Sequence, residues 1–205
     1  MKKLLQLGFM SVMVLSALAL TSCASTKLTS SWLDENYKGK ALGKIMVVGI
    51  SDSVEKRTMF EKEFVEQLKK HGLDAVSAIE TVPDLSLEAI KKSAMDLKVD
   101  DILVTCMVGK KEKEIYVAAP ISTIPGGPYN RFDSYFPLVY ERTTQPGYYE
   151  KATYVNLETC LYDAKTGKLV WSGVSETFEP MSLGYMVKSM SRAVFENWRE
   201  SGLIK

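Results

Sequence analysis

The order of apolar patterns along the chain predicts an α/β fold built on a mixed sheet. Two continuously apolar strands alternate with helical stripes in the first half, and long alternating strands follow in the second half. An amphipathic stripe then closes the chain. Alternating strands and helices indicate parallel strands joined by right-handed crossovers. We therefore expect a parallel βαβαβ start, then long antiparallel strands and a C-terminal helix, with helices on both faces of the sheet.

The first 22 residues have the pattern of a secretory leader. Lys2 and Lys3 precede an almost uninterrupted apolar run at 4–20, which is short for a spanning helix of about 20 apolar residues. Small residues and then Cys23 follow, and this ending resembles a bacterial lipobox. The resemblance implies cleavage before Cys23 and covalent lipid on Cys23. We expect no other cofactor. An ordinary leader with an incidental cysteine, or a membrane-spanning helix, is the alternative.

The lipobox resemblance also implies a place in the cell envelope. Ala24 rather than aspartate follows Cys23, which in enteric-type bacteria implies sorting to the outer membrane. Two or more acyl chains anchor a protein stably. We expect a protein that meets the membrane through this anchor and whose body faces the periplasm.

Cleavage would leave 183 of the 205 residues, enough for one domain with a real core. Residues 23–43 are expected to be the lipidated cysteine and a polar tether, in which Trp32 and Tyr37 fold back onto the body. Residues 44–205 are expected to form a single α/β domain.

The charge balance gives no case for nucleic-acid binding. The leader carries two lysines and no acidic residue, so its removal takes the formal net charge from +1 to −1. A near-neutral domain with mixed charges lacks the basic surface that nucleic acid requires. We expect no nucleic-acid partner.

The domain begins with a strand at 44–50, which is apolar throughout, as a strand covered on both faces should be. Asp52 is the expected N-cap of the following helix, with Glu55 completing a capping box. That helix extends to His71, with an apolar stripe formed by Phe60, Phe64, Val65 and Leu68.

A weaker strand at 74–79 and a second helix capped by Ser86 follow, and then a third strand at 101–108. The weak hydrophobicity of 74–79 suits a sheet edge. The three strands would then lie in the order 2-1-3, which places the two crossover helices on opposite faces.

Extended chain resumes after Gly109 and leads into a Pro/Gly-rich insert at 120–150. The insert holds seven of the chain's 20 aromatic residues. It can form a projecting β-ribbon that contacts a protein or glycan, or its rings can cover the open flank of the sheet or sit in a loop. The candidate partner-binding residues are Tyr129, Phe132, Tyr135, Phe136, Tyr140, Tyr148 and Tyr149.

The remaining chain predicts an antiparallel hairpin and a closing helix. Residues 151–162 alternate between apolar and polar, and a turn at 163–168 leads to a partner strand at 169–178. A stripe from Met181 onward, with Val187, Met190 and Val194, forms the last helix.

The residues that could carry chemistry are better explained by structure. Ser51, Asp52 and Ser53 lie between a strand and a helix without a Gly-x-Ser-x-Gly elbow, and capping explains them. Cys106 and Cys160 are buried thiols or a disulfide pair. His71 is the single histidine and no Cys-x-x-Cys spacing occurs, so we expect no metal site. We name no catalytic residue and expect no enzyme.

The lipobox, the strand at 44–50, the hairpin from Leu161 to Ser172 and the closing helix resemble a group of uncharacterised bacterial outer-membrane lipoproteins. More distantly, the layout is similar to the amino-terminal domain of TolB, to the lipoproteins that activate penicillin-binding proteins and to the curli-secretion lipoprotein. The resemblance implies an α/β domain that binds another protein. The aromatic insert departs from the TolB-like pattern.

Three hypotheses follow. The first is a non-catalytic, lipid-anchored module that binds another envelope protein. The second is an envelope assembly component of the secretion type that forms homo-oligomers through the insert or a strand edge. The third is an enzyme, which would need a pocket with convergent polar groups.

Overall fold

The computed structural model describes residues 26–82, 85–117, 131–144 and 147–204. The leader, Cys23 and Tyr129 lie outside the described residues, so the structure does not test the expectations about them. Within the described part of the chain, no helix is both long and apolar enough to cross a membrane.

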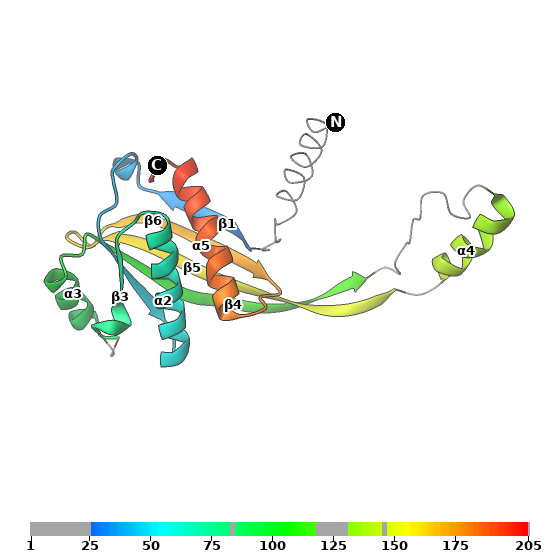
Figure 1. Ribbon diagram of the computed structural model, residues 1–205, viewed down its shortest axis with the longest axis horizontal. Coiled ribbons are helices and arrows are strands. Elements are labelled where there is room, and N and C mark those ends of the chain that lie inside the picture. The colour runs from blue at the N-terminus through cyan, green and yellow to red at the C-terminus, as the bar shows by residue number, and fades with distance from the viewer. Residues whose placement is uncertain (1–25, 83–84, 118–130, 145–146, 205) are drawn as a thin grey trace, which may run out of the picture.

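The described strands form one six-stranded mixed sheet in the order β1-β6-β5-β4-β2-β3 (Figure 1). β2 runs parallel to β3 and β4, and the other neighbours are antiparallel. This confirms the parallel start, with the expected strands in the order 2-1-3 and the weak one at an edge. The strands are β1 (Thr26–Leu33), β2 (Ile45–Ile50), β3 (Ala75–Ser77), β4 (Asp101–Val117), β5 (Tyr148–Asp163) and β6 (Leu169–Phe178).

Helices cover both faces of the sheet, as the sequence predicts. α2 and α5 lie side by side on one face, where the larger core cluster includes Phe64, Trp171 and Trp198. α3 packs on the other face over a smaller cluster that includes Met46, Val48 and Ala94. The helices are α2 (Val54–Lys70), α3 (Leu87–Asp96), α4 (Phe132–Thr144) and α5 (Leu183–Glu200), with 3-10 turns η2 (Glu35–Tyr37) and η3 (Ala78–Glu80).

The caps of the two crossover helices are serines. The Ser86 hydroxyl accepts a hydrogen bond from the Ala89 N–H at 3.2 Å, as expected. At α2 the cap is Ser53, whose hydroxyl accepts from the Lys56 N–H at 3.2 Å, so the expectation of Asp52 as cap is wrong. The helix starts one residue later than the sequence pattern indicates, which leaves Asp52 exposed.

The segment expected to be a tether at 23–43 instead contributes a strand and a turn. Its described part forms β1, which pairs along β6, and the Thr26 hydroxyl lies 2.8 Å from the Thr177 hydroxyl. Tyr37 packs against the larger core cluster, as expected. β1 is polar because an antiparallel edge strand packs only one face on the core, here partly covered at Leu28 and Leu33, and serine and threonine suit its solvated side. The described part of this segment, from Thr26 onward, therefore belongs to the folded body.

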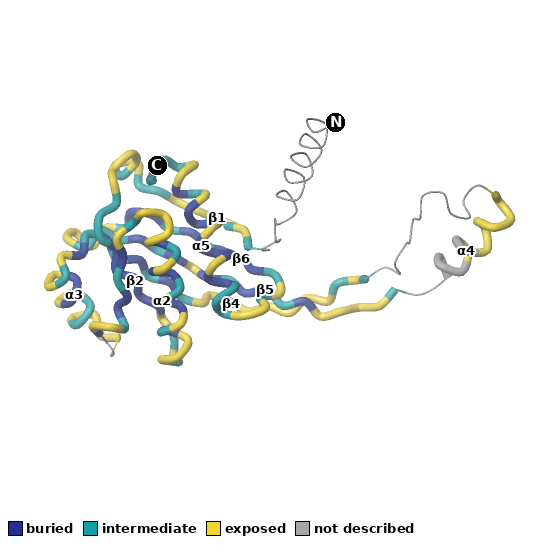
Figure 2. The backbone as a smooth tube through the Cα atoms, viewed as in Figure 1, coloured by how far each residue is buried: buried dark blue, intermediate teal, exposed yellow. Residues whose placement is uncertain are grey.

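The insert also differs from its expected form. β4 and β5 continue beyond their other neighbours as a two-stranded ribbon, pairing from Glu112 with Thr153 to Val117 with Tyr148. The chain then forms α4, a helix, which none of the three forms considered for the insert included. Pro137 lies inside this helix, and proline is normally a sign of a helix break. Figures 1 and 2 show α4 beyond the far end of the ribbon and a largely exposed surface there.

Candidate functional site

We call the ribbon at 112–117 and 148–153, together with α4, the arm. On α4, Phe132, Phe136 and Tyr140 recur every four residues and therefore share one face. Their rings follow one another at centroid distances of 5.5 and 5.9 Å, forming an aromatic ladder. Phe132 is 76% exposed and Phe136 is 54% exposed. Large apolar rings thus face solvent at the end of the arm.

A second aromatic group lies on the ribbon. Tyr116 pairs with Tyr149 across the two strands, and their ring centroids lie 5.4 Å apart. The Tyr116 hydroxyl accepts a hydrogen bond from the Gly147 N–H at 3.1 Å. A side chain at Gly147 would clash with this ring, since a Cβ there would lie 2.4 Å from Tyr116. The glycine therefore allows the ring to lie across the strand end.

The structure groups the predicted aromatic residues in two sets. α4 carries Phe132, Tyr135, Phe136 and Tyr140, while Tyr148 and Tyr149 lie at the start of β5. Sequence reasoning missed Tyr116, because only the strand register brings it opposite Tyr149. The alternation around Tyr116 was visible in the sequence. The register with its partner strand was not, because the sequence does not show where the first strand ends and the second begins.

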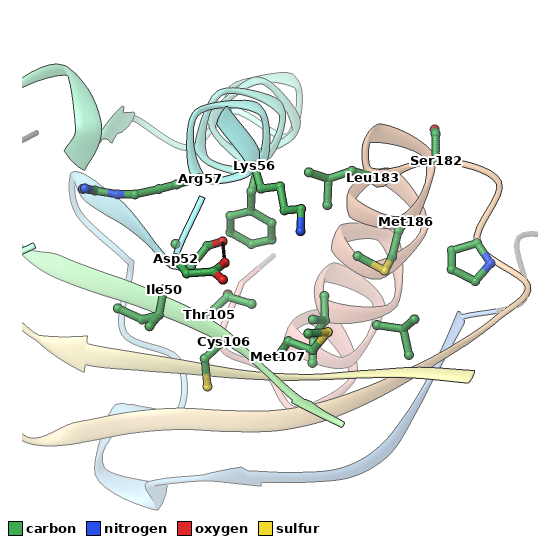
Figure 3. A pocket seen from close by; sticks show the side chains of 16 residues that line it. Ile50, Asp52, Lys56, Arg57, Thr105, Cys106, Met107, Ser182, Leu183 and Met186 are labelled. Atoms are coloured by element: carbon green, nitrogen blue, oxygen red, sulfur yellow. Dashed lines mark hydrogen bonds between the residues drawn. The ribbon is translucent and has the colours of Figure 1, made fainter. Parts of the chain in front are cut away.

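The body carries a pocket of about 630 Å³ between α2, α5 and the sheet (Figure 3). It opens at the carboxyl end of β2, beside the middle of its parallel neighbour β4, and the crossover helices on either side of β2 lie on opposite faces. Ligands of α/β proteins commonly bind at this position. The pocket was not predicted, because its residues come from distant parts of the chain. Its apolar walls are Phe60, Met107, Val155, Leu157, Leu183 and Met186.

Two charged residues, Asp52 and Lys56, lie at the rim of the pocket. Figure 3 shows Asp52 and Lys56, at the start of α2, directed toward the cavity and facing α5. Both side chains are exposed. The Cys106 thiol points away from the cavity, to the other side of β4. Burial raises the pKa of this thiol, and the nearby Glu158 raises it further, which disfavours the nucleophilic thiolate.

The residues weighed for chemistry are kept apart. His71 caps the far end of α2 from Ser51, at a separation of about 25 Å for a helix of this length. Its Nδ1 lies 2.8 Å from the Gln67 carbonyl oxygen, and its ring packs on Phe195. Cys160 is a free thiol like Cys106, and burial raises its pKa too. Among the described residues no group of histidine, cysteine and acidic side chains could hold a metal ion.

A buried ion pair fixes the helix that borders the pocket. Glu61 is fully buried and accepts from the Arg57 Nε at 2.7 Å and from the Gly49 N–H at 3.0 Å. Its other oxygen accepts from the Ser77 hydroxyl at 2.7 Å and the Ile79 N–H at 2.6 Å. These bonds tie α2 to β2, β3 and η3, and so hold one wall of the pocket in place.

No protein-family model matches the chain, and no curated protein matches it. Among solved structures, the chain is similar to the PelC dodecamer from Paraburkholderia phytofirmans, at 12% identity over 83% of this chain and 95% of that chain, with a TM-score of 0.44. It is also similar to lipoprotein GNA1162 from Neisseria meningitidis, at 15% identity over 77% of this chain and 99% of that chain, with a TM-score of 0.42. Likeness at this level leaves function to be argued from the chain itself.

Proposed function

We propose that this chain is a lipid-anchored component of the cell envelope that faces the periplasm and acts as a non-catalytic protein-binding module. The arm is its binding surface. The observation that carries the proposal is the exposed aromatic ladder on α4, led by Phe132 and Phe136. The place in the envelope is supported by the sequence alone, through the lipobox ending at Cys23.

Exposed aromatic rings at the end of a projecting element favour a binding role. Each phenylalanine or tyrosine can bury roughly 150–250 Å² in a contact, at a low cost in side-chain entropy. Clustered apolar surface of this kind marks interaction sites on proteins that are otherwise soluble. The ribbon is six residue pairs long, about 20 Å, so it presents α4 to a partner well away from the body.

Replacing the aromatic side chains of the ladder is expected to abolish binding of the partner protein. In cells that express the full-length chain, Phe132→Ser together with Phe136→Ser should abolish the recovery of proteins that crosslink to and co-purify with the wild-type chain. The matched control is Leu87→Ser with Met95→Ser, which removes two similarly exposed apolar side chains from α3. The control should retain the partners. Equal recovery by the arm variant and the wild type would refute the proposed binding surface.

The anchor predicts a labelling result. Cells fed an alkyne-tagged fatty acid should label the full-length chain, and Cys23→Ala should remove the label completely, because Cys23 offers both the sulfur and the new amino terminus. Cys106→Ala is the control and should label like the wild type, because its thiol lies within the folded body. Label that persists in Cys23→Ala would contradict the anchor.

A further inference from the structure

The aromatic ladder and the body pocket are two apolar surfaces of the same chain. The ladder projects into solvent, and the pocket is a hollow. We infer that the partner of the arm is a second copy of this chain, with α4 of one copy seated in the pocket between α2 and α5 of the next. The inference rests on the proposed role of the arm as a binding surface, and it adds the identity of the partner and the place where the arm docks.

The chemistry of the two surfaces matches. The pocket walls are apolar, and two of them, Met107 and Met186, have flexible thioether side chains. Methionine adapts to the shape of aromatic rings and makes favourable sulfur–ring contacts. The ladder from Phe132 to Tyr140 is about 12 Å long along the helix axis. Amphipathic helices that bind grooves present anchors at this kind of spacing.

The charges around the two surfaces are also complementary. The start of α4 carries Arg131 and Asp133, and the pocket rim carries Asp52 and Lys56, so each surface holds one cation and one anion. None of the salt bridges among the described residues involves Lys56. Asp133 pairs with Arg131 of its own copy at 2.8 Å, and both side chains are exposed, so Asp133 of one copy faces Lys56 of the next by exchanging one surface ion pair for another. Charges at the rim of an interface orient the partners more than they add affinity.

In this structure the arm lies away from the pocket of its own copy. The pocket includes Met107 and Val155, which lie just before the point where the ribbon leaves the sheet. The ribbon then carries α4 away from the body (Figure 1). Each copy thus offers one arm and one pocket on different parts of its surface. Such a contact is heterologous, and repeated copies close into a ring or continue as a filament.

The area involved sets the strength of the contact. Two or three aromatic side chains bury about 300–750 Å² on one partner, against about 800 Å² per partner in a standard interface. A single arm-in-pocket contact is therefore weak in solution. Copies held on one membrane surface meet at a high effective concentration, and a ring adds a second contact for each copy.

Disulfide trapping tests the inference in cells that express two differently tagged full-length chains. One chain carries Phe136→Cys on the ladder, and the other carries Leu183→Cys in the pocket wall. Mild oxidation should link at least half of the less abundant chain into a dimer that contains both tags. The matched controls are Ser134→Cys on the opposite side of α4 and Leu87→Cys on α3. Ser134→Cys is paired with Leu183→Cys, and Leu87→Cys is paired with Phe136→Cys. Each control pair should give less than a tenth of the dimer yield of the test pair.

Met107→Cys is a second pocket position, since Met107 is 63% exposed and its replacement leaves the core intact. Dimers no more abundant than in the controls at both pocket positions would overturn the inference. If the arm variant still loses its co-purified proteins in that case, the partner is a different protein and the proposed function stands. If the arm variant loses nothing, the proposed function fails as well.

Discussion

Replacing Glu61 with alanine is expected to lower the free energy of unfolding by about 3–5 kcal/mol. The change leaves the buried Arg57 guanidinium without its carboxylate, which lies 2.7 Å from Nε. It also removes the acceptor of the Gly49 N–H, the Ser77 hydroxyl and the Ile79 N–H. A buried charge that loses this ion-pair partner and buried donors that lose their acceptor each carry a large desolvation cost.

Urea unfolding of the purified chain measures this loss. Glu66→Ala is the matched control on the same helix, because Glu66 pairs with Lys70 at the surface and such pairs contribute less than about 1 kcal/mol. Replacing the pair together, with Arg57→Met and Glu61→Leu, should cost less than Glu61→Ala alone, since no charge is then stranded. A loss for Glu61→Ala as small as that for Glu66→Ala would show that the buried pair does not stabilise the fold.

Replacing Trp171 with alanine is the second change with a large expected effect, again about 3–5 kcal/mol. Trp171 is fully buried, meets Trp198 edge to face at 5.6 Å, and donates its indole N–H to the Asn197 side-chain oxygen at 2.9 Å. The substitution opens a cavity between β6 and α5. It also removes the hydrogen bond from the indole N–H to Asn197.

Thermal and urea unfolding of Trp171→Ala and Trp171→Phe separate the two contributions. Trp171→Phe keeps most of the buried ring and loses the hydrogen bond, so it should destabilise less than alanine. Gly173→Ala probes the same site from the strand, because a Cβ at Gly173 would lie 2.5 Å from the Trp171 ring. We expect a loss of about 1–3 kcal/mol from this overpacking. Wild-type stability in Trp171→Ala would contradict the assigned core.

The parallel half of the fold could be predicted because its signals are local and agree with one another. β2 is buried along nearly its whole length and reads as a continuous apolar run. Ser86 and the stripe of Phe60, Phe64 and Leu68 mark their helices directly. β1 was missed because an edge strand that buries one face can be as polar as a linker. Only its pairing with β6, about 140 residues later, makes it a strand.

The candidate site was partly within reach of the sequence. The enrichment of aromatic residues located the arm, and six of the seven candidates lie on its described residues. The helical form of α4 was not predicted, because Pro137 and the surrounding prolines and glycines favour irregular chain. The pocket was beyond reach, since its walls join Phe60, Met107 and Met186, residues that only the tertiary fold brings together.

The presence of β1 changes how the proposed anchor would hold the protein. Thr26 is already hydrogen-bonded to β6, so only three peptide steps separate it from Cys23, a reach of at most about 10 Å. With the proposed anchor, so short a linker would keep the Thr26 end of β1 and the Thr177 end of β6 close to the lipid headgroups. It would also restrict how far the body can tilt. Neighbouring copies would then share one height and a similar orientation on the bilayer, which turns a search in three dimensions into one across a plane.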